Sequence, residues 1–112
     1  MTGNFEPGLH PSREHAYLAE IFERLESDDA AARALMIARS RAVVGLWRQA
    51  PESPVRLIET WERLLDGPVA TMRRIALADD EQGRELRHFM PFAGILTNAE
   101  RTALFKAYPK RR

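Results

Sequence analysis

The chain has 112 residues, of which 45% are hydrophobic and 29% are charged, and it contains no cysteine. A chain of this size folds as one domain with a core of its own, and the lack of cysteine excludes disulfides and thiolate metal sites. Its net charge of +1 provides no long-range attraction to nucleic acid or to an anionic membrane. Because neither a membrane span nor a signal peptide is visible, we expect a cytoplasmic protein without membrane contact.

Apolar periodicity predicts helices and no strand, after a flexible segment over residues 1–11. Ser12 is expected to cap a first helix that runs to about residue 26. Ser27, Asp28 and Asp29 are expected to end this helix and start a second one, which runs from near residue 29 to residue 48. Ser53 is expected to cap a third helix that starts with Pro54 and ends near residue 66. Trp61 lies at the centre of the apolar stripe of this third helix, which is the clearest amphipathic helix in the chain.

Three further helices are predicted in the second half of the chain. The Gly67-Pro68 pair ends one helix and starts the next, which should reach about residue 78. Asp79 or Asp80 is expected to cap a short helix to about residue 89, weakened by Gly83. Residues 97–100 match a capping box and predict a last helix over 98–107. We therefore expect an all-α fold, a compact single-domain bundle of five or six short-to-medium helices over residues 12–112.

The second predicted helix is apolar on two sides. At about 100° per residue, a broad apolar face combines Ala31, Ala32, Leu35, Met36, Ala42, Val43, Leu46 and Trp47. The opposite side carries Ile37 and Val44 among Arg33, Arg41 and Arg48. We expect the broad face to pack in the core and the arginine-bearing face to be available to a partner.

Arg39 lies in the middle of the broad apolar face. An unpaired charge buried there would cost several kcal/mol, so a carboxylate partner is required. Glu20, Glu23 and Glu62 are the candidates for a buried ion pair. A guanidinium that reaches the edge of the core, or one that binds a ligand, is the alternative.

The segment from Arg87 to Glu100 has no charged residue between its ends, and Pro91 and Gly94 prevent a continuous helix. It is predicted to be an apolar loop anchored in the core by its ends. Phe89 and Leu96 are expected to be these anchors, whereas Phe92 and Ile95 at the crown should be partly exposed and form a docking patch flanked by Arg87 and Arg101. Phe89 is also expected to contact the partner. A loop wholly buried under the helices is the alternative.

The sequence offers little for catalysis. His10 and His15 are five residues apart and do not share a helix face as a metal-binding pair would. His88 lies beside the apolar loop, where a structural role is the simpler interpretation. Because the glycines are isolated, no phosphate-binding loop is present. We therefore expect no enzyme activity, no catalytic residue, no metal and no cofactor.

Residues 34–48, followed by Ser53-Pro54 and another helix, resemble the helix-turn-helix region of small phage-type repressors and antitoxins. The resemblance implies a turn near residues 38–40 and a recognition helix that presents Arg41 and Arg48. It departs from the pattern at Ala38, where glycine is usual, and an unbroken helix is the competing interpretation.

These observations favour a small bacterial-type interaction or regulatory protein. It would dock a protein partner, or a second copy of itself, through the loop over residues 89–96, the arginine-bearing face of the second helix, or both. The alternative is a DNA-binding regulator or an antitoxin-like protein that uses a degenerate helix-turn-helix near residues 34–48.

Overall fold

The computed structural model describes residues 10–27 and 29–109, and these residues form six helices and no strand. The helices are α1 (Arg13–Ser27), α2 (Ala30–Gln49), α3 (Val55–Asp66), α4 (Val69–Ala76), α5 (Glu81–His88) and α6 (Asn98–Ala107). The prediction of an all-α single-domain bundle is confirmed. The flexible segment expected over residues 1–11 falls almost entirely outside the described residues.

Short polar side chains define where several helices begin. The side chains of Asp29 and Asp80 each accept a backbone N–H from three residues further on, at 2.8 and 2.7 Å. The predicted capping box is present, because Thr97 accepts the N–H of Glu100 and Glu100 accepts the N–H of Thr97 at 2.8 Å. These three starts follow from the physics of unsatisfied first-turn amides.

The start of α3 differs from the prediction. Pro54 is the N-cap residue and Val55 is the first helical residue, and no side chain caps this end. The expected Ser53 cap is therefore wrong. The backbone N–H of Ser53 instead donates to the carbonyl of Ala50 at 3.3 Å in the turn that precedes α3.

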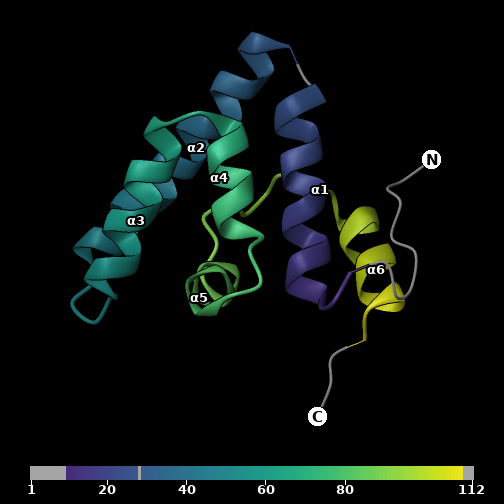
Figure 1. Ribbon diagram of the computed structural model, residues 1–112. Coiled ribbons are helices and arrows are strands. Elements are labelled where there is room, and N and C mark those ends of the chain that lie inside the picture. The colour runs from purple at the N-terminus through teal and green to yellow at the C-terminus, as the bar shows by residue number, and fades with distance from the viewer. Residues whose placement is uncertain (1–9, 28, 110–112) are drawn as a thin grey trace.

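Helix α1 is the centre of the bundle and packs against α2, α4, α5 and α6 (Figure 1). Helix α2 packs against α3 and α1, and α6 packs against α1 alone. The core consists of side chains that are almost fully buried, among them Leu18, Ile21, Phe22, Leu25, Ile58, Trp61, Met72, Leu86 and Phe92. The apolar faces predicted for the first and third helices are thus confirmed.

A close backbone approach joins α4 to α5. A Cβ atom at Gly83 would lie 2.2 Å from the carbonyl oxygen of Ala78, so this position accepts only glycine without a backbone shift. Beside it, the Nη1 atom of the buried Arg87 donates to the carbonyls of Ala76 and Ala78, each at 2.9 Å. Gly83 is therefore a packing requirement rather than only a weak point of the helix.

The two N-terminal histidines meet because His10 precedes α1 and folds back onto it. Their Nδ1 atoms are 3.1 Å apart, and the backbone N–H of His10 donates to the hydroxyl of Tyr108 at 2.9 Å. Partial burial lowers the pKa of both imidazoles, and Coulombic repulsion from His10 and Arg87 lowers that of His15 further. Within the described part of the chain, no group of three or more His, Asp or Glu side chains is placed to hold a metal ion.

Candidate functional site

The face of α2 that packs on the bundle is the narrow one. Ser40 and Val44 are each 1% exposed, and Ile37 is partly buried against the core. The hydroxyl of Ser40 donates to the carbonyl of Met36 at 3.0 Å, which satisfies this buried polar group. Met36 and Trp47, from one edge of the broad apolar face, also pack against the core. The expected orientation of α2 is therefore wrong in part, because Leu35 and Leu46 of that face do not reach the core.

The arginines on the packed side reach outward from its margins to neighbouring helices. Arg33 donates to the carbonyl of Leu25 at 2.6 Å, Arg41 pairs with Asp66, and Arg48 donates to both carboxylate oxygens of Glu62 at 2.9 and 2.7 Å. Hydrogen bonds from Arg48 also lower the pKa of Glu62. Within the predicted docking surface, Ile37 and Val44 thus face the bundle and are not available to a partner, whereas the head groups of Arg33, Arg41 and Arg48 bind oxygens of α1 and α3. Arg41 and Arg48 remain exposed.

Arg39 is exposed, so the predicted buried ion pair is wrong. The three carboxylates considered for it, those of Glu20, Glu23 and Glu62, pair with other arginines. No hydrogen bond or ion pair of Arg39 occurs within the described residues. The guanidinium of Arg39 is therefore free to bind a group outside this domain.

The remainder of the broad apolar face of α2, including Leu35 and Leu46, is left on the surface. Leu35 and Leu46 are 62% and 66% exposed. Ala31, Ala38 and Ala42 are also exposed on this side, around Arg39. We call these six residues the open face of α2. Two large leucines of one helix are therefore in contact with solvent.

The resemblance to a helix-turn-helix fails on geometry. Helix α2 runs unbroken from Ala30 to Gln49, so residues 38–40 form no turn and no separate recognition helix begins there. The competing interpretation, one continuous helix, is confirmed.

The apolar loop over residues 89–96 turns inward. Phe92 is 1% exposed and Leu96 is 4% exposed, and the hydroxyl of Tyr17 donates to the carbonyl of Phe92 at 3.3 Å. Gly94 has a φ of +84°, which lets the chain reverse between the two buried side chains. The anchoring role of Leu96 is confirmed, and the predicted exposure of Phe92 is wrong.

The other residues of the predicted loop patch do not form one surface. Arg87 is 7% exposed and is bound to backbone carbonyls, so it cannot provide a charged rim. Ile95 is partly buried against the core, whereas Arg101 is exposed on α6 beside the ring of Phe105. Phe89 is partly buried and lies at a different feature, a groove between α3 and α5.

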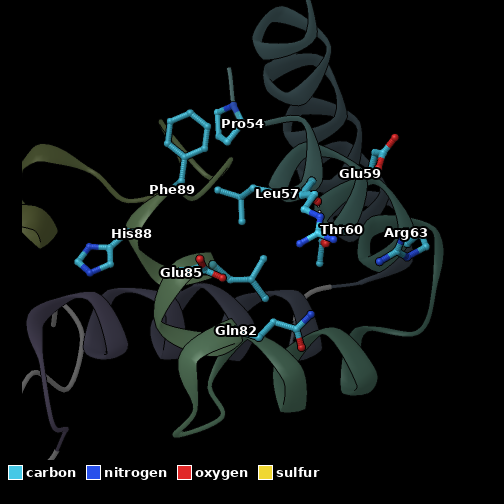
Figure 2. A pocket seen from close by; sticks show the side chains of 11 residues that line it. Pro54, Leu57, Glu59, Thr60, Arg63, Gln82, Glu85, His88 and Phe89 are labelled. Atoms are coloured by element: carbon cyan, nitrogen blue, oxygen red, sulfur yellow. Dashed lines mark hydrogen bonds between the residues drawn. The ribbon is translucent and has the colours of Figure 1, made fainter. Parts of the chain in front are cut away.

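This groove has a volume of about 760 Å³ and was not predicted, since its walls come from two helices, α3 and α5, that are not consecutive in the chain. Figure 2 shows Leu57 extending from α3 into the hollow, opposite the side chains of α5, with Pro54 and Phe89 at one end. The ring of His88 points away from the other side chains. The groove is within the size range of ordinary ligand sites.

None of the helices in the described part of the chain is long and apolar enough to cross a membrane. Comparison with known proteins finds no matching family model, and no curated protein or solved structure shows significant similarity to this chain.

Proposed function

We propose that this chain is a small, non-enzymatic interaction domain that docks a partner protein through the open face of α2. The exposure of Leu35 and Leu46 carries the proposal. Burying a leucine side chain contributes roughly 1.5–3 kcal/mol, so two that lie three turns apart can supply the centre of an interface. The alanines between them allow another helix to approach closely.

The charge of α2 indicates the kind of partner. The helix contains four arginines and no acidic residue. Three of these arginines bind oxygens within the domain, which leaves Arg39 in the middle of the open face. A partner helix with an apolar stripe and a carboxylate at its centre would satisfy both features, because a buried cation requires a counter-charge.

A second copy of the chain fits less well. In an antiparallel pair of α2 helices, Leu35 would meet Ala42 and Leu46 would meet Ala31, which matches large to small side chains. The same register places the two Arg39 side chains together at the two-fold axis. Because like charges repel at that point, we favour a different, acidic partner.

Affinity capture from the native host, compared between variants, tests the proposal. Leu46→Ser and Arg39→Glu should each lose the captured partner while the denaturation midpoint stays within error of the parent, because both side chains are exposed. Phe105→Ser is the matched control, because Phe105 is a large exposed apolar side chain that lies on α6, outside the open face. This variant should retain the partner. Equal capture by all variants would contradict the proposal, as would a salt-dependent complex with DNA as the only interaction.

A further inference from the structure

The groove between α3 and α5 has a floor that is fixed before any ligand arrives. The ring of Phe89 stacks on Trp47, with centroids 4.1 Å apart and planes at 27°. The indole N–H of Trp61 donates to the carbonyl of Phe89 at 2.7 Å, and Leu86 is fully buried. Because these groups are already ordered, a ligand that binds them loses little free energy to rearrangement of the site.

The rims of the groove carry charged side chains, of which Glu59 interacts electrostatically with Arg48 of α2. Arg56, Glu59 and Arg63 lie along α3, and Glu85 lies opposite on α5. None of these four takes part in an ion pair or a side-chain hydrogen bond within the described residues. Two cations and two carboxylates sum to zero, which favours a ligand with both donors and acceptors over a polyanion.

The shape of the groove favours an extended chain. Its α3 rim runs from Pro54 to Arg63, about 13 Å at 1.5 Å per residue. Four residues of extended polypeptide cover about the same length at roughly 3.3 Å each. A short peptide therefore matches the groove in length, in polarity and in having apolar side chains for its floor.

We infer that this groove binds a short, extended segment of a partner protein, with one apolar side chain held between Leu57 and Phe89 and a carboxylate directed at Arg63. The apolar side chain would rest against the Phe89 ring, and Glu85 would receive a donor from the same segment. This site uses no residue of the open face of α2, so it does not depend on the function proposed above.

A library of random twelve-residue peptides displayed on phage provides the probe. Selection on the immobilised protein should enrich peptides that combine an aromatic or large aliphatic residue with a nearby acid. Synthetic copies should bind in fluorescence anisotropy and should shift the amide NMR signals of residues 55–63 and 82–89. Loss of a charge-assisted hydrogen bond is expected to weaken binding about tenfold in Arg63→Glu.

Arg74→Glu is the matched control, because Arg74 is an exposed arginine of α4 outside the groove, and it should change affinity less than about twofold. Failure to enrich any peptide would overturn the inference. Equal binding of the peptides to Arg63→Glu, or amide shifts confined to α2, would overturn it as well. Failed enrichment or equal binding to Arg63→Glu would leave capture of a partner by the open face untouched, whereas shifts confined to α2 would locate the peptide on that helix instead.

Discussion

Replacing Phe92 with alanine tests whether the apolar loop is part of the core. The Phe92 ring is 1% exposed and packs edge-on against Trp61, at 5.4 Å and 88°, and against Phe22, at 6.2 Å and 70°. A buried Phe→Ala change costs about 3–5 kcal/mol, and two aromatic pairs at about 0.5–1.5 kcal/mol each place this site in the upper part of that range.

Urea unfolding followed by tryptophan fluorescence measures the change. A domain of this kind holds about 5–15 kcal/mol in total, so Phe92→Ala should lower the midpoint strongly and can leave the domain largely unfolded. Thr97→Ser is the control, because it changes a residue next to the same loop but keeps the hydroxyl that caps α6. Its unfolding midpoint should remain near that of the parent. A loss below about 1.5 kcal/mol for Phe92→Ala would refute the packing described here.

Other changes have equally direct expectations. Gly83→Ala should destabilise by about 2 kcal/mol or more in urea unfolding, because the new methyl group would lie 2.2 Å from the Ala78 carbonyl oxygen; an unchanged midpoint would contradict this close approach. The lowered pKa values of His10 and His15 mean that the unfolded chain binds protons more readily, so the free energy of unfolding should be level above the ordinary pKa of 6.5 and fall as the pH drops below it. The His15→Gln variant should show a smaller fall over the same pH range in parallel titrations. Arg39→Met should leave stability within about 0.5 kcal/mol, since the side chain is exposed, but should weaken partner capture.

The helices could be predicted because their signals are local. A cap such as Asp29 or the Thr97–Glu100 pair satisfies amides within one turn, so sequence spacing alone specifies the contact. Buried faces with a simple apolar stripe, such as the one around Trp61, could be predicted for the same reason. Ser53 failed as a cap because Pro54 takes that position and the preceding turn uses the Ser53 amide.

The orientation of α2 could not be predicted by counting apolar residues. Its packed side contains Val44 and the partly buried Ile37 between arginines, which gives it low apparent hydrophobicity. The stems of Arg41 and Arg48 cover neighbouring helices while their head groups bind oxygens at the edge. Which face is buried therefore depends on carbonyls and carboxylates supplied by α1 and α3, and those are tertiary contacts that no single-helix pattern contains.

The groove and the α4–α5 junction were missed for a related reason. Gly83 was interpreted from its helix propensity, whereas its role depends on the carbonyl of Ala78 in the preceding turn. Phe89 was predicted to anchor the loop in the core, whereas it stacks on Trp47 and its ring lies at the groove floor. In both cases the contact that determines the role of the residue, Ala78 for Gly83 and Trp47 for Phe89, lies in another segment of the chain.

Adjacent residues of α2 connect these observations. Trp47 stacks on the ring that forms the groove floor, whereas Leu46 is 66% exposed on the open face, because successive side chains are separated by about 100° around the helix axis. Helix α2 thus contacts the floor of the groove through Trp47 and carries the open face itself. Polar substitutions at Leu46 leave the aromatic contact in place, so the two surfaces can be tested separately even though one helix serves both.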